Sequence, residues 1–295
     1  MNDAKIYSQG YRRYDGERTG LPGAIRSLQK QSLREALGMR RPARHKIIPI
    51  LIILFSYLPA IGFVGFAIVA KTFGGDTIGD IAKDIIPDYA DFYGLTNFAV
   101  IVLAGLVIPS LLCSDKRNGM LGVYLSSPLN RASYMIGKLW ASFLILLTVT
   151  LGPPLLLLIA LSLQGFGPES FSDWIKTFGQ IVMGSSLIGL FYVLISMAIS
   201  TFTDRRNIAS VIFFAILFGS SAVIAIVQDV TEITFIRLLN PLLVPLRLVQ
   251  RVFGTEGGWT YADNSTFSIW ISWIAFTGIS ILILWVSYRR LLVRR

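Results

Sequence analysis

Residues with catalytic chemistry are scarce in this sequence. The chain has one histidine, His45, and one cysteine, Cys113, too few for a zinc site, which takes several His, Cys or carboxylate ligands. A serine-hydrolase triad needs a base beside the nucleophile, whereas His45 stands between Arg44 and Lys46. A single cysteine also excludes an internal disulfide. These residues predict neither an enzyme active site nor a metal site.

The sequence also lacks the usual phosphate-binding loop of nucleotide-binding proteins. That loop reads G-x-x-x-x-G-K-[ST]. The only Gly-Lys pair is Gly137-Lys138, which is followed by Leu139, and Ala132 stands where the first glycine of the loop would be. We therefore expect no cofactor to be bound by this chain directly, and any ATP hydrolysis to be done by another subunit.

The composition indicates a membrane protein. Hydrophobic residues make up 54% of the 295 residues and charged residues 15%, whereas soluble domains carry about 25% charged residues. Six runs of at least 22 residues contain no Asp, Glu, Lys or Arg, and a helix of about 20 apolar residues crosses a bilayer. The sequence predicts an all-α polytopic membrane protein whose six transmembrane helices lie at about residues 47–70, 92–114, 139–168, 177–203, 207–228 and 264–288.

The net charge of +10 is unevenly distributed along the chain. Residues 1–46, 114–138, 203–207 and 289–295 hold 21 of the 27 Lys and Arg residues but only 6 of the 17 Asp and Glu residues. Lys and Arg mark cytoplasmic loops, so both termini are expected in the cytoplasm, including a basic tail at residues 289–295. This alternation disfavours nucleic-acid binding, which a basic excess can otherwise indicate.

Residues 1–46 are predicted to form a cytoplasmic tail with an amphipathic helix. Apolar side chains recur on one face between Leu21 and Met39, and basic side chains lie on the opposite face. Such a helix suits the interface between lipid headgroups and water. Leu33 and Leu37 project sideways, and either a protein partner or membrane lipid alone would satisfy this pattern.

The segment between the second and third spans predicts a helix, a break and a second helix. Met120, Val123 and Tyr124 are spaced i, i+3 and i+4, which places them on one face of a short helix. A Ser-Ser-Pro sequence follows, and Asn130 can cap the next helix. This arrangement suits a docking element at the inner surface, and a solvated connector is the alternative.

The segment between the fifth and sixth spans is apolar but too short to cross the membrane. Arg237 and Arg247 enclose 9 uncharged residues, fewer than a span needs. Pro241 and Pro245 interrupt any helix there. We expect two short helices that dip into the outer leaflet as a re-entrant hairpin, with Asn240, Pro241 and Pro245 at its turn.

Two segments of the chain carry motifs: Asp115, Arg117, Gly119, Leu125, Ser127-Pro128, Arg131 and Gly137-Lys138 in the first, and Leu239-Asn240-Pro241-Leu242 in the second. These motifs resemble a known family, the type-2 ABC permeases of the type V exporter kind. These are membrane subunits of bacterial and archaeal ABC exporters. The sequence Leu239-Asn240-Pro241-Leu242 is similar to an apolar family segment with Asn or Ser before Pro. Two positions depart from the pattern, since the family usually has Glu in place of Asp115 and Thr in place of Met120. The first of the two segments is similar to the family's first cytoplasmic loop.

The resemblance implies a permease subunit in the plasma (inner) membrane of a prokaryote. It would form the substrate pathway as a dimer with a second copy or a homologous permease, and bind two copies of a separate ABC ATPase that holds ATP and Mg. The alternatives are an ATP-independent channel or carrier and a non-transporting membrane scaffold. The ATPase-coupling residues that the resemblance implies are Asp115, Arg117, Gly119, Met120, Tyr124, Leu125, Pro128, Arg131, Lys138, Leu33 and Leu37.

The family resemblance also places the first, second and fifth spans along the substrate pathway or the dimer contact. Phe55 and Phe66 share a face of the first span, and Ser210, Phe214 and Ser221 share a face of the fifth. Small and hydroxyl-bearing side chains allow close helix contacts in membranes. For each of these residues, packing against lipid or against the chain's own core is the alternative.

Overall fold

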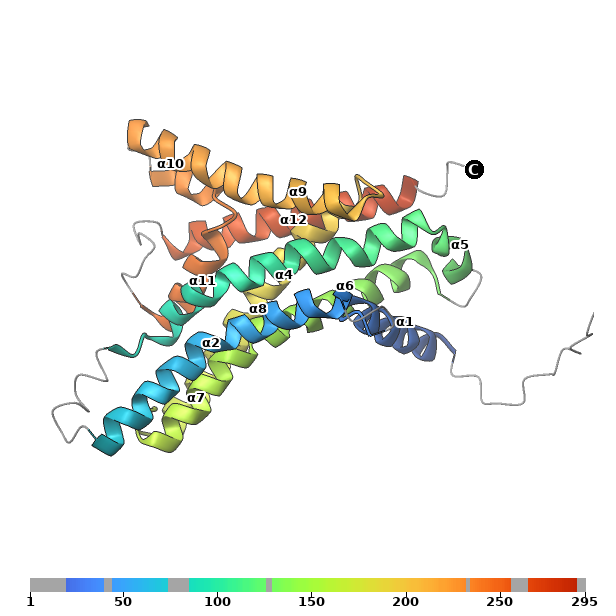
Figure 1. Ribbon diagram of the computed structural model, residues 1–295. Helices are drawn as coiled ribbons and strands as arrows, with labels where there is room; N and C mark the ends of the chain where they lie inside the picture. Colours follow the sequence, from blue (N-terminus) through green and yellow to red (C-terminus); the bar gives the residue numbers. More distant parts are fainter. Residues whose placement is uncertain are drawn as a thin grey trace, which may run out of the picture.

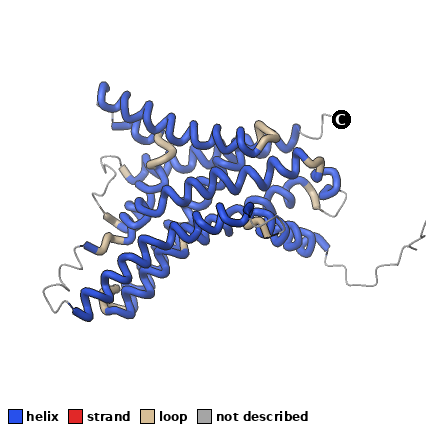
Figure 2. The backbone as a smooth tube through the Cα atoms, in the orientation of Figure 1, coloured by secondary structure: helices blue, strands red, loops and turns tan. Residues whose placement is uncertain are grey.

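The structure is a computed structural model that describes residues 20–39, 44–73, 85–125, 129–231, 234–255 and 265–290. All regular secondary structure in these ranges is helical (Figures 1 and 2), which confirms the all-α prediction. Six helical segments in the same ranges are long and apolar enough to cross a membrane, as the charge-free runs predict.

The helices alternate in direction between two ends of the bundle (Figure 1). One end of the bundle carries α1, α5 and the carboxyl end of the last span, and we call it the α1 end. We call the opposite end the α11 end. The spans are α2 (Arg44–Phe73), α4 (Tyr89–Arg117), α6 (Arg131–Thr150) with α7 (Gly152–Gln164), α8 (Phe171–Ser200), α9 (Arg206–Phe214) with η1 (Ala215–Gly219) and α10 (Ser220–Thr231), and α12 (Thr266–Arg290). The shorter helices are α1 (Gly20–Ala36), α5 (Met120–Leu125), η2 (Thr234–Leu239) and α11 (Val244–Phe253).

Two spans are interrupted. The third span breaks at Leu151, and Pro153 lies in the first turn of α7, where a missing N–H is tolerated because those groups have no intrahelical partner. The fifth span contains a π-helical segment, η1. A π-helix is wider than an α-helix and is rare, and no sequence pattern predicted it here.

Two helices form the centre of the bundle. In α4 and α8, 72% of the most apolar window is buried, against 17% in α2 and in the fifth span. Hydrogen bonds cross the central contact, where Ser196 Oγ donates to Ala104 O at 2.9 Å and Tyr93 OH donates to Ile181 O at 2.9 Å. Such bonds and close packing hold helices together in membranes. The peripheral helices leave large apolar faces for lipid or another protein.

Gly105 lets α9 pack closely on α4. A Cβ atom at this position would lie 2.6 Å from Phe214 Cζ and 2.8 Å from Phe213 Cδ1. Replacing Gly105 with Leu is expected to lower the free energy of unfolding by about 1–3 kcal/mol because the added side chain overpacks the contact. Thermal unfolding in detergent measures this, with Gly94→Leu on the same helix as the control because open space surrounds Gly94. Equal melting temperatures of the two variants would contradict the prediction.

Candidate functional site

A buried ion pair joins α4 and α6 at the α1 end. Lys138 Nζ lies 2.8 Å from Asp115 Oδ2, and the two side chains are 1% and 5% exposed. Lys138 Nζ also donates to Leu111 O at 3.2 Å, and Tyr134 OH donates to Asp115 Oδ2 at 2.7 Å. Buried charges are tolerated where an opposite charge and further hydrogen bonds compensate for the lost water. This arrangement fixes the register of α6 against α4.

Aromatic rings extend the ion pair to two further helices. The Tyr134 ring lies between Tyr124 of α5, at 5.5 Å between centroids, and Tyr288 of α12, at 6.0 Å. Burial, then the negative charges of Asp115 and Glu35, raise the pKa of Tyr124 to about 12, so its phenol is protonated at neutral pH. The stack therefore links α5 and the last span to one polar cluster.

The short helix α5 stands on this cluster with an apolar surface outward. Gly119, with φ +64°, turns the chain from α4 into α5, a conformation that L side chains rarely adopt. Val123 is 61% exposed and Met120 36%. Beyond α5, Asn130 Oδ1 caps α6 by accepting from Ser133 N at 2.8 Å, as the sequence predicts.

The helix α1 packs along α6 beside the cluster. Leu28 is 3% exposed, and a Cβ atom on Gly137 would lie 2.8 Å from Leu28 Cδ2. The middle of the expected apolar face, at Leu28, Ser32 and Ala36, is buried against the chain itself, whereas Leu21 and Met39 at its two ends are 42% and 56% exposed. Leu33 also packs against the core, and Leu37 is half-buried.

The carboxyl end of α4 also forms hydrogen bonds with the chain at the carboxyl end of α8. Lys116 Nζ donates to Ser200 O at 3.2 Å and to Thr201 O at 2.7 Å, and Cys113 Sγ donates to Thr203 O at 3.3 Å. The last carbonyl oxygens of a helix lack intrahelical partners, and the two Lys116 bonds supply donors to Ser200 and Thr201 at the end of α8. Sequence analysis assigned Lys116 no role.

The structure brings together only part of the predicted coupling set. Asp115, Lys138 and Tyr124 meet in the cluster, whereas Arg117 and Arg131 are exposed at the same end. Pro128 and the side chain of Leu125 lie outside the described residues. Sequence analysis missed Tyr134 and Tyr288. A signal existed for Tyr134, which stands four residues before Lys138 and therefore on the same helix face.

The family model for the ABC-2 family transporter protein matches residues 82–289, which is more than two thirds of the chain and includes the cluster. The chain belongs to the ABC-2 transporter family. No curated protein matches it. As an ABC-2 family member, it is a transmembrane permease domain and a membrane component of an ABC transporter, rather than an ATPase. The match begins after α2, so the packing of α1 on α6 comes from the structure alone.

In this ABC-2 family member, the turn between η2 and α11 is tied to the fifth span. Asn240 is 4% exposed, its Nδ2 donates to Ser221 Oγ at 2.9 Å, and its Oδ1 accepts from Leu242 N at 3.0 Å. Pro241 is buried, and Pro245 lies in the first turn of α11. These residues shape the connection between two short helices, as predicted, and its depth in the membrane stays a prediction.

The predicted pathway residues do not form one site within a single chain of this family member. Ser210 Oγ donates to Arg206 O at 3.0 Å, Phe214 stacks on Phe218, and Ser221 contacts the η2–α11 turn. Phe55 is 54% exposed on α2, and Phe66 lies three turns further along the same helix. They are spread over two peripheral spans.

Replacing Asn240 with Ala is expected to lower the free energy of unfolding by about 1–3 kcal/mol, because it leaves the half-buried N–H of Leu242 without its acceptor and removes the bond to Ser221. A double-mutant cycle with Ser221→Ala, followed by thermal unfolding, measures the coupling. The two changes share one hydrogen bond, so their combined effect should be smaller than their sum. Strict additivity would contradict the bond.

Proposed function

We propose that this chain is the permease subunit of an ATP-driven exporter. It works as a dimer and binds two copies of a separate ABC ATPase, which holds ATP and Mg. Membership of the ABC-2 family carries the proposal. The excess of Lys and Arg in the segments of the α1 end supports a cytoplasmic position for that end and for both termini, in the plasma membrane of a prokaryote.

The cluster at the α1 end supports a route for coupling. The exposed face of α5 would contact the ATPase, and α5 leads through the tyrosine stack to the Asp115–Lys138 pair. A displacement of α5 therefore moves a rigid contact shared by α4, α6 and α12. Packed elements of this kind carry coupling between distant sites when they have two arrangements.

The exposed peripheral spans support a second subunit at the substrate pathway. Only 17% of the most apolar window is buried in α2 and in the fifth span, and these spans carry Phe55, Phe66, Ser210, Phe214 and Ser221. We place the pathway along these two spans at the dimer contact, with the η2–α11 turn as a re-entrant hairpin in the outer leaflet.

Purification under mild conditions from the native host tests the proposal. An ABC ATPase should co-purify, and ATP should drive cargo or lipid transport by the complex in liposomes. Transport by this chain alone would support the channel or carrier alternative. A stable complex that moves no cargo would support a scaffold.

Replacing Gly119 with Val is expected to uncouple ATP hydrolysis from transport. Open space surrounds Gly119, so the effect comes from its left-handed backbone, which disfavours a β-branched residue by about 1–2 kcal/mol. Transport per ATP hydrolysed should fall several-fold, and Arg131→Gln should act in the same direction by weakening contact with the ATPase. Gly119→Asn is the matched control because Asn tolerates this backbone conformation. Full transport by Gly119→Val and Arg131→Gln would contradict a coupling role for this loop.

A further inference from the structure

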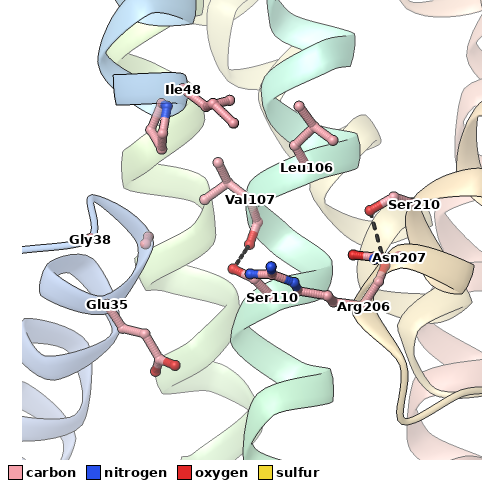
Figure 3. Close-up of a pocket in the computed structure, with 11 residues that line it drawn as sticks. Glu35, Gly38, Ile48, Leu106, Val107, Ser110, Arg206, Asn207 and Ser210 are labelled. Atoms are coloured by element: carbon pink, nitrogen blue, oxygen red, sulfur yellow. Dashed lines mark hydrogen bonds between the residues drawn. The ribbon is translucent and has the colours of Figure 1, made fainter. Parts of the chain in front are cut away.

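A cavity of about 250 Å³ lies at the α1 end, where α1, α2, α4 and α9 meet (Figure 3). Figure 3 shows Glu35 on the α1 side and Arg206 on the opposite, α9 side, with its guanidinium reaching toward Ser110 of α4. Apolar side chains from α2 and α4, including Ile48 and Leu106, close the remaining wall. One acid and one base therefore share a cavity with an apolar side.

The hydrogen bonds in the cavity decide what it can bind. Ser110 Oγ donates to Val107 O at 2.7 Å and Ser210 Oγ donates to Arg206 O at 3.0 Å, so neither hydroxyl proton is available to a ligand. The Arg206 guanidinium has no hydrogen-bond or ion-pair partner among the residues that the structure describes. Arg206 and the Asn207 amide are thus the donors that an anion would meet.

Arg206 also borders a larger polar cavity of about 700 Å³. That cavity is lined by Arg117, Arg205 and Asp204 as well as by Arg206 and Asn207. The amino end of α9, where Arg205 makes no side-chain cap, adds partial positive charge. Arg206 therefore stands between a cationic, water-facing surface and the smaller cavity beside the spans.

An apolar groove of about 400 Å³ lies next to the smaller cavity along the same two helices, α2 and α4. On α2, Ile48 lines the cavity, and Leu51 and Ile52, one turn further along, line the groove. On α4, Leu106 lines the cavity and Val102 lines the groove. The helices are antiparallel, so both sets advance toward the middle of the span. Phe55 and Leu58 extend the groove further.

We propose that this cavity binds the headgroup of a membrane phospholipid whose acyl chain lies in the groove. Arg206, with Asn207, binds the phosphate. The volume is slightly below the roughly 300–1,000 Å³ of pockets for whole small molecules, which suits a headgroup whose chain lies outside the cavity. The inference concerns binding alone and does not rest on transport or on an ATPase.

Native mass spectrometry of the purified full chain, titrated with phosphatidylethanolamine or phosphatidylglycerol, tests the headgroup site. Arg206→Gln should weaken both lipids about tenfold, the effect of losing one charge-assisted hydrogen-bonded contact. Arg289→Gln is the matched control, since Arg289 is an exposed arginine at the same end that stacks on Trp285. Equal losses in Arg206→Gln and Arg289→Gln, or no loss in Arg206→Gln, would overturn the proposal.

A competition experiment separates a lipid site from a site for soluble anions. Inorganic phosphate and phosphoethanolamine, at the concentration of the lipid, should leave phosphatidylethanolamine bound because they cannot occupy the groove. Val102→Trp, which fills the groove, should weaken the lipid several-fold, whereas Val211→Trp on the exposed face of α9 should not. Full displacement by either soluble anion, or unchanged affinity in Val102→Trp, would contradict the lipid assignment. Melting temperatures of all variants confirm that each is folded, and failure here would leave the proposed function standing.

Discussion

Replacing Lys138 with Met is expected to lower the free energy of unfolding by about 3–5 kcal/mol, the cost of leaving a buried charge without its partner. The Asp115 side chain is 5% exposed, and after the change only the Tyr134 hydroxyl would compensate its negative charge. Met keeps the length of the Lys side chain and is apolar, so the effect isolates the charge. Unfolding of the purified protein in detergent measures it.

The double variant Asp115→Leu with Lys138→Met separates the charge from the packing. Replacing both members of a buried ion pair with apolar residues is often close to neutral, so most of the lost stability should return, apart from about 1 kcal/mol for the Tyr134 hydroxyl. A double variant as unstable as Lys138→Met, or a Lys138→Met variant as stable as the wild type, would contradict the account of this cluster.

Replacing Gly137 with Leu is expected to displace α1 from α6 and to reduce ATP-coupled transport strongly. Even a Cβ atom there would lie 2.8 Å from Leu28 Cδ2, closer than carbon atoms can pack, and α1 is short enough to move as a unit. Leu33 and Leu37 of α1 are also among the ATPase-coupling residues that the family resemblance implies, so displacement of α1 would disturb that contact too. Labelling of Ser32→Cys with a water-soluble maleimide, in a Cys113→Ala background, reports the displacement because Ser32 is fully buried.

Two variants control this experiment. Leu28→Ala combined with Gly137→Leu removes the clashing side chain and should restore both protection of position 32 and transport. Gly179→Leu makes the same change on α8 in open space and should be tolerated. Continued protection of position 32 in Gly137→Leu would show that α1 does not depend on this contact.

The spans and caps were predictable from the sequence because their signals are local. A run without charged residues fixes a membrane span by length alone, and Asn130 caps α6 through a residue three positions away. The break at Leu151 likewise precedes a Pro-Pro pair. Each of these features depends on residues within one or two helical turns.

The polar cluster and the position of α1 were not predictable in the same way. Tyr134 and Tyr288 are far apart in the chain and meet only after α6 and α12 pack. The amphipathic pattern of α1 requires an apolar surface opposite it, but the pattern is identical whether that surface is lipid or α6. The small size of Gly137, which decides the contact with Leu28, becomes meaningful only once both helices are placed.

Site-specific photo-crosslinking tests most directly whether the α1 end binds the ATPase. A photoreactive amino acid at Val123, on the exposed face of α5, is compared with one at Val230, which is 79% exposed at the other end of the bundle. In the complex that co-purifies, Val123 should crosslink to the ABC ATPase and Val230 should not. Crosslinks to the ATPase from Val230 and none from Val123, with the complex intact, would contradict the account.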